Sequence, residues 1–500
     1  MRTLLRYFTT PDDPPHLKWI LLGFLALIPL YLSAVAAHGE KWNHGGPLKP
    51  GDPETYYLND QKVYLRAASK IHEIGLDFVA PRQRTLGYSY VLAAFYDSSL
   101  DPETREKPIS LEWFAKAKNV NAWLSVFLLI ALGVFFARTL SFGFAATAIT
   151  VTAFLLYIFR ASYTQPELLY WTLNSILFYL LWMMLREPRW WLGIAAGVLA
   201  AAAFFVKAGT LPLIYLFIAA FGFKMVWDWL ILKRGWSWKT VLRGALVPVV
   251  FVVTLFPYLQ HSWKTFGSPF YSTYSKHIMW SEDKDEMYAV MTAGAAEKLI
   301  TDAEFQTEYR NHYQKRYPDA DPSTVPVRPV PSAKRYFADN SLAEAKVRLD
   351  DGFESNRSRM KKYYPSAWKF LERSFNGTIV LVAIAAIGFS IGARKRLGRT
   401  ILEGIPIFLY VLGFFTGYLI LYAWYNELGI GVRLMLSLYV PFIFTVLWVG
   451  DRLGKSLKIP LPGGGGVYLV KVLPLILLAY AATKAHRVFT SELYVNYSGA

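Results

Sequence analysis

Long apolar runs alternate with short basic segments along most of the chain. A membrane-spanning helix needs about 20 predominantly apolar residues, and eleven runs approach that length. They are 18–37, 119–137, 142–159, 167–185, 190–206, 208–226, 242–260, 376–393, 402–422, 430–449 and 466–483. We therefore predict an all-α polytopic membrane protein with about eleven transmembrane helices. The first run has no clear cleavage context, so we interpret it as an anchor that is retained.

The basic residues between these runs predict an orientation. With a cytoplasmic N-terminus, every cytoplasmic turn is basic, whereas the opposite short turns contain only Arg160 and Lys207. These basic turns lie at Arg138, 186–189, 224–243, 394–399 and 452–458. Basic residues collect in cytoplasmic loops of membrane proteins. The pattern predicts a multi-pass protein of the plasma (inner) membrane.

Two long hydrophilic segments then fall on the non-cytoplasmic side, and both contain helical patterns. The predicted organisation has five parts: 1–37, the N-terminal tail and first span; 38–118, a first extracytoplasmic loop with amphipathic helices; 119–260, spans two to seven; 261–375, a large extracytoplasmic loop; and 376–500, the last four spans and a short tail.

Charge and composition exclude several function classes. The net charge of +17 suggests nucleic acid binding. However, the cations lie in short clusters between apolar runs, so we expect the lipid bilayer as a partner and no nucleic acid. The chain contains no cysteine, which excludes disulfides and thiolate metal sites, and its eight histidines show no metal-ligand spacing. We expect no cofactor and no metal.

Ionisable residues beside the predicted spans are candidates for function, because charge near the hydrocarbon is unfavourable. In the first loop, Asp60 precedes Tyr64 by four residues, and Arg84 opens the segment that reaches Tyr88. A plain alternative is that Asp60 caps a surface helix, as aspartate often does, and that Arg84 begins an ordinary helix.

Three further charges lie at the predicted outer ends of later spans. Glu167 follows Pro166 at the start of a span, where the helix dipole alone favours a carboxylate. Lys207 ends another span and could extend to the headgroups. Arg433 follows the turn 424–431. Together, carboxylates and cations on one side of the bilayer suit a reaction between a phosphate-bearing lipid and a hydroxyl.

The order of these residues resembles the C-type membrane glycosyltransferases, which use polyprenyl-phosphate sugars and include protein O-mannosyltransferases and lipid A aminoarabinose transferases. The resemblance is carried by the acid, tyrosine and small-residue pattern, the Arg-x-x-Gly-Tyr segment, the Glu and Lys at span ends, Trp-x-x-Phe-Gly and a late Arg before Pro. These are Asp60, Tyr64, Ala67-Ala68, Arg84 to Tyr88, Glu167, Lys207, Trp263, Phe266-Gly267, Arg433 and Pro441. It covers about 1–270 and the last hydrophobic third.

The resemblance implies transfer of one sugar, with inversion, from a polyprenyl phosphate to a hydroxyl of a lipid, glycan or protein acceptor at the outer or periplasmic face of the cell envelope. It implies that Asp60 is the base and that Glu167 is a second catalytic carboxylate. Tyr64, Arg84, Tyr88, Lys207, His261 and Arg433 would bind the donor. One departure is His261-Ser262, which stands where related enzymes often carry Arg-Asn. A divalent metal, used by relatives with pyrophosphate donors, is not required.

Two other function classes remain open. A secondary transporter or flippase-like carrier would have a similar number of spans, but would place its charges near the bilayer midplane on broken helices. A lipid-linked polysaccharide ligase or polymerase would need one large late loop and not the acidic first loop. A common cavity for Asp60, Glu167 and Lys207 would favour the transferase.

Overall fold

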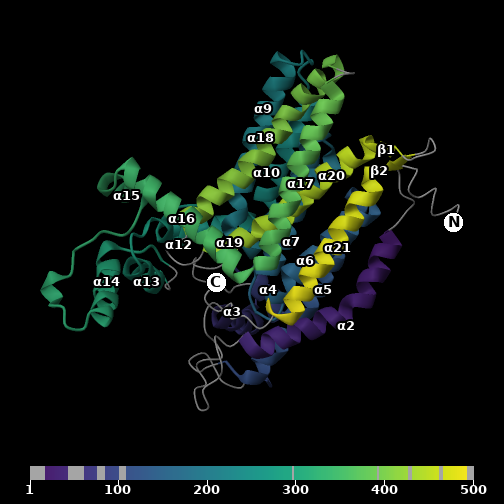
Figure 1. Cartoon of the computed structure of the whole chain (residues 1–500). Helices are drawn as coiled ribbons and strands as arrows, with labels where there is room; N and C mark the ends of the chain where they lie inside the picture. The colour runs from purple at the N-terminus through teal and green to yellow at the C-terminus, as the bar shows by residue number, and fades with distance from the viewer. Residues whose placement is uncertain are drawn as a thin grey trace.

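The computed structural model describes residues 17–42, 61–75, 85–100, 109–294, 298–390, 394–425, 431–460 and 466–492. Long helices form a bundle, and a group of shorter helices projects from one end of it (Figure 1). The long helices are α2 (Leu17–Trp42), α5 (Leu111–Thr139), α6 (Phe142–Leu155), α7 (Glu167–Arg186), α8 (Trp190–Val206), α9 (Leu211–Leu230), α10 (Trp238–Thr254), α17 (Pro365–Ser390), α18 (Arg394–Trp424), α20 (Tyr439–Ser456) and α21 (Leu469–Thr490).

Short elements complete the chain. Two helices come from the first predicted loop, α3 (Gln61–Ile74) and α4 (Gly87–Ala93). α11 (Phe256–Phe266) begins in the run 242–260 and continues into the second loop. That loop also contains α12 (Thr273–Lys276), η5 (Ile278–Trp280), α13 (Lys284–Ala293), α14 (Asp302–Arg316), η6 (Pro322–Thr324), α15 (Ala333–Asp339) and α16 (Leu342–Tyr363). Turns in the bundle form η3 (Tyr157–Phe159), η4 (Ala208–Thr210), α19 (Gly431–Met435) and η8 (Leu436–Leu438). A small antiparallel hairpin pairs β1 (Lys458–Pro460) with β2 (Gly466–Tyr468).

The helices confirm a polytopic helical membrane protein, with fewer clear spans than the predicted number. Within the described residues, eight helices are long and apolar enough to cross a membrane, or nine with the bent pair α10 and α11. The run 190–206 is a shorter apolar helix, α8. The run 376–393 falls on α17 and on residues outside the described part, and α17 is not among the eight.

The bend between α10 and α11 has a local cause. The two helices meet at 64°, and Pro257 occupies the first turn of α11. Proline has no backbone N–H and clashes with the preceding turn, so it begins a helix well and breaks a continuing one. The break lies near the last turn of α8, because Phe204 contacts Tyr258 with ring centroids 6.0 Å apart.

All five basic turns that the sequence assigns to the cytoplasm lie at the same end of the bundle. Side-chain contacts join them in series: Ser141 donates a hydrogen bond to Asp451, Arg186 lies over the Trp448 ring, Arg243 donates to the Pro188 carbonyl, and Arg234 pairs with Glu403. We term this the turn end, and the opposite end, where α3, α4 and α11–α16 lie, the loop end. The loop topology and the choice of cytoplasmic side stay predictions.

The second loop is a helical unit that is held by ion pairs and docked tightly on the bundle. The fully buried Glu286 carboxylate accepts hydrogen bonds from Arg328 at 2.8 Å and Arg335 at 2.6 Å. Gly352 of α16 crosses α18 so closely that a Cβ there would lie 2.1 Å from the Ala423 carbonyl oxygen. The chain is extended at Asn340, which separates α15 from α16.

Candidate functional site

Glu167 and Lys207 meet at the loop end of the bundle. Glu167 is the first residue of α7, where its charge favours the helix N-terminus, and it is only 4% exposed. Lys207 follows α8 in an extended conformation that ends the helix. Its Nζ lies 3.5 Å from Oε1 of Glu167. Two residues that the sequence singled out separately therefore form an ion pair, largely shielded from solvent.

Tyr88 lies beside this pair. Its ring is fully buried and its hydroxyl donates a hydrogen bond of 2.9 Å to Oδ1 of Asn121. Burial raises the pKa of Tyr88 well above its ordinary value, and the negative charge of Glu167 raises it further. Tyr64 packs edge-on against Tyr88, with centroids 5.6 Å apart. At ordinary pH, Tyr88 is thus a neutral hydrogen-bonding group next to a carboxylate.

The first loop is anchored on the turn that carries Glu167. The side-chain oxygen of Gln61 accepts hydrogen bonds from the backbone N–H and the hydroxyl of Thr164, at 2.9 and 3.1 Å. Gln61 is itself buried, at 1% exposed. Asp60, the preceding residue in the chain, lies outside the described residues, so its predicted role as base stays a prediction.

A second anchor reaches the turn that carries Lys207. The Thr85 hydroxyl donates a hydrogen bond of 2.7 Å to the carbonyl of Val206. Next to it, Gly87 approaches the backbone of Phe205 and Val206 so closely that a Cβ would lie only 2.8 Å away. Arg84 lies outside the described residues.

His261 and Arg433 were expected to bind the donor with this group. His261 is half-buried in α11, and its ring nitrogen Nε2 lies 3.3 Å from the Thr265 hydroxyl in the same helix. Arg433 is half-buried in α19, which packs against α16 and α18 at the loop end. Both lie in segments at the loop end, and their roles stay predictions.

Sequence reasoning missed the polar residues that support the pair from inside the bundle. Asn121 bridges α5 to the turn before α7, because its amide donates to the carbonyls of Ala161 at 2.9 Å and Tyr163 at 2.6 Å. Tyr170 lies one turn after Glu167, with its ring 5.7 Å from the Lys207 ammonium. An amide inside an apolar span was the available signal for Asn121. The spacing from Glu167 was the signal for Tyr170.

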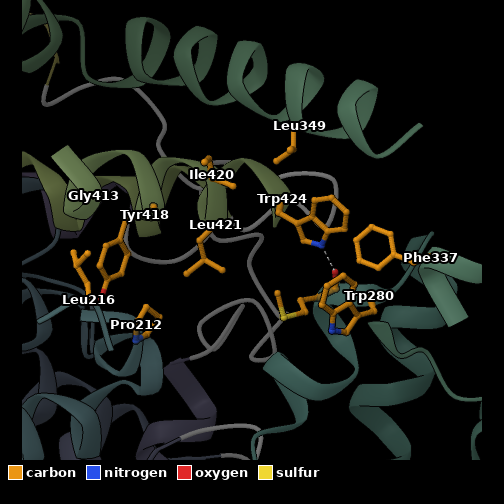
Figure 2. A pocket seen from close by; sticks show the side chains of 12 residues that line it. Pro212, Leu216, Trp280, Phe337, Leu349, Gly413, Tyr418, Ile420, Leu421 and Trp424 are labelled. Carbon is orange, nitrogen blue, oxygen red and sulfur yellow. Dashed lines mark hydrogen bonds between the residues drawn. The ribbon is translucent and has the colours of Figure 1, made fainter. Parts of the chain in front are cut away.

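An apolar cleft of about 520 Å³ opens between the bundle and the second loop. Pro212, Leu216 and Tyr418 line its bundle side, and Trp280 and Phe337 come from the loop (Figure 2). Gly417 also lines the bundle side. The Tyr418 hydroxyl donates a hydrogen bond of 2.6 Å to the Gly209 carbonyl, in the turn that follows Lys207. One wall of the cleft is therefore continuous with the turn that holds the ion pair.

The described residues contain no group of three or more His, Asp or Glu side chains placed to hold a metal ion. Comparison of the chain with protein-family models, with curated proteins and with solved structures finds no match. The resemblance to membrane glycosyltransferases is thus carried by residues of this chain alone.

Proposed function

We propose that this protein is a membrane glycosyltransferase that moves a sugar from a polyprenyl phosphate to an acceptor hydroxyl, with inversion, at the loop end of the bundle. The observation that carries the proposal is the ion pair of Glu167 with Lys207, flanked by Tyr88 and by the anchored first loop. Residues from three separate segments that the resemblance selects meet at one place. A set of unrelated surface charges has no reason to converge in this way.

Each group in the site has a task in this reaction. The acceptor oxygen attacks the anomeric carbon, the bond from that carbon to the phosphate oxygen breaks, and the lipid phosphate leaves with the bonding electrons. The phosphate is stable as an anion and needs a nearby cation, which Lys207 supplies. Asp60 takes the proton from the acceptor hydroxyl. Glu167 holds Lys207 in place and stabilises positive charge that develops on the sugar.

The apolar cleft suits a donor with a lipid tail. Its lining is almost entirely hydrocarbon and aromatic, and Tyr418 connects it to the turn after Lys207. A lipid whose chain enters the cleft would bring its phosphate towards that turn. The cleft concerns the donor tail alone, and the proposal assigns neither the sugar nor the acceptor.

A transporter would use the same residues differently. Transporters bind substrate near the midplane, on helices broken there. Here the break between α10 and α11 lies beside the end of α8, and Glu167 and Lys207 lie at helix ends. These positions favour chemistry at the membrane surface over passage through the bundle.

The decisive experiment incubates the purified full-length protein with a panel of polyprenyl-phosphate sugars and candidate acceptors, and measures the released lipid phosphate. We expect release with one donor class, and loss of release in Asp60→Asn with normal membrane insertion. Wild-type turnover by Asp60→Asn would remove that residue as the base. Arg433→Ala should weaken donor use more than acceptor use.

Glu187 provides a control for the loss of a negative charge from α7. Glu187 ends the same helix that Glu167 begins, is exposed, and pairs with Arg189 at the turn end. Glu187→Gln should keep full activity where Glu167→Gln loses it. Movement of the labelled lipid across proteoliposomes without release of lipid phosphate would replace the transferase with a carrier.

A further inference from the structure

Basic side chains gather where α17 and α21 pack against each other at the loop end. Lys369 and Arg373 are four residues apart on α17, and Lys484 and Arg487 are three apart on α21. These spacings place each pair on a single helix face. The charge of Lys484 lies close enough to the other three to interact with all of them. We term these four residues the basic cluster.

Aromatic packing holds the cluster together across the two helices. The Tyr480 ring lies 5.1 Å from the Arg373 guanidinium and 5.0 Å from the Lys484 ammonium. It also stacks on Phe370 of α17, with centroids 5.8 Å apart. A ring face attracts cations. Tyr480 therefore holds the charges of Arg373 and Lys484 close together, although they repel each other.

Acidic residues balance only part of this charge. Arg487 pairs with Glu492, with Nε 3.4 Å from Oε1, and Ser366 also donates to that carboxylate at 2.6 Å. Among the described residues, no carboxylate lies within 4.0 Å of the charged nitrogens of Lys369, Arg373 or Lys484. The cluster is therefore a positively charged surface at the loop end of α17 and α21.

The surface changes from charged to apolar towards the middle of the same two helices. Val380 is 57% exposed and follows Arg373 by seven residues on α17. Ile476 is 60% exposed and precedes Lys484 by eight residues on α21. Separations of seven and eight residues return to the same helix face. Cations above exposed hydrocarbon match a molecule with an anionic head and apolar chains.

We propose that the basic cluster binds the phosphate of an anionic membrane lipid whose chains lie along α17 and α21. Clustered Lys and Arg beside a span attract anionic headgroups. A soluble acidic partner would not account for the exposed apolar strip that continues below the cations. The cluster lies on other helices than Glu167 and Lys207, so this inference does not depend on the proposed function.

Lipid binding to the purified full-length protein tests the inference. Native mass spectrometry would compare phosphatidylglycerol, phosphatidylcholine and soluble glycerol phosphate as ligands. We expect saturable binding of phosphatidylglycerol only, and a loss of roughly tenfold in its affinity in the double variant Lys369→Gln and Lys484→Gln. The matched control is Arg138→Gln with Lys239→Gln, which removes two exposed cations at the turn end and should leave the affinity unchanged.

Other outcomes overturn the proposal. Equal losses in both double variants would mean a general effect of net charge, and equal binding of phosphatidylcholine would mean that the cations play no part. Binding of glycerol phosphate as tightly as the lipid would mean a soluble anion site. Lys369→Arg with Lys484→Arg keeps the charges and should retain binding. Loss in this variant while it stays folded would contradict an electrostatic site.

Discussion

The Nζ atom of Lys207 lies 3.5 Å from Oε1 of Glu167, although the two residues begin and end different helices. This relationship allows a structural role to be separated from a chemical one. If the pair only holds α7 and the end of α8 together, removing both charges at once should be tolerated better than removing one, because a lone buried charge is left unpaired in each single variant.

The first prediction concerns the loss of activity when the Lys207 charge is removed. Lys207→Met should lower kcat for release of lipid phosphate by roughly 100-fold or more, because the leaving phosphate loses its cation. The double variant Glu167→Gln with Lys207→Met should stay equally inactive while its thermal unfolding midpoint returns towards that of wild type. Recovery of activity in the double variant would show that the pair serves the fold alone.

The second prediction concerns the cleft. A Cβ at Gly417 would meet nothing within 4 Å, so Gly417→Leu adds a side chain to open space on the cleft wall. We expect the KM for a long polyprenyl donor to rise about tenfold, since a buried hydrocarbon chain would be displaced, with little change in kcat. The variant should use a donor analogue with a short chain as well as the wild type does.

Gly377→Leu is the control for this prediction. Gly377 also faces open space, but on α17 and away from the cleft. The two variants add the same surface to the membrane-embedded part of the protein. An equal rise of KM in both variants would mean that the cleft does not hold the donor chain.

The third prediction tests the contact between the first loop and the bundle. Gly87→Ala would place Cβ 2.8 Å from the backbone of Phe205 and Val206, so α4 must move away from Lys207. Overpacking of this kind destabilises by about 1–3 kcal/mol, and Tyr88 would shift with the helix. We expect a lower thermal unfolding midpoint and reduced turnover.

Gly222→Ala serves as its counterpart. Gly222 lies within α9, and an added Cβ there meets nothing within 4 Å. Alanine favours a helix over glycine by up to about 1 kcal/mol, so this variant should match or exceed wild-type stability. A midpoint for Gly87→Ala that equals that of Gly222→Ala would contradict the tight contact.

The spans were predictable because each was a local property of the sequence. Runs such as 142–159 and 208–226 contain enough apolar residues to define a helix without its neighbours. The bend at Pro257 was less visible, since the run 242–260 continues through it. The length of an apolar run does not reveal where the helix bends.

The site was predictable in part, for a related reason. Glu167 and Lys207 stood out because charge beside an apolar run is unfavourable and therefore conspicuous. Tyr170, Tyr418 and Asn121 are weaker signals, because a tyrosine or an amide in a span often serves packing alone. Their roles follow from long-range contacts, such as that of Tyr418 with Gly209, which no local pattern encodes.

The last prediction is a pH dependence in the second loop. His277 is buried between α12 and η5, and its Nδ1 donates a hydrogen bond of 2.8 Å to the Pro331 carbonyl. Burial lowers the pKa of His277 below the ordinary 6.5, and the neighbouring charge of Lys276 lowers it further against the effect of the hydrogen bond. The folded loop therefore prefers the neutral ring.

The sign of the effect follows from the direction of this pKa shift. Below about pH 6.5 the unfolded segment takes up a proton more readily than the folded one, so loop stability falls until the pH passes the lower folded pKa. His277→Asn keeps a donor near Pro331 and should remove this fall. Hydrogen exchange of α13 and α15, measured at pH 7.5 and 5.0 and corrected for the intrinsic exchange rate at each pH, would report it as lower protection factors at pH 5.0 in wild type and not in His277→Asn. Ser275→Ala, an exposed position in the same segment, should behave as wild type, and equal acid sensitivity in His277→Asn would assign the effect to another group.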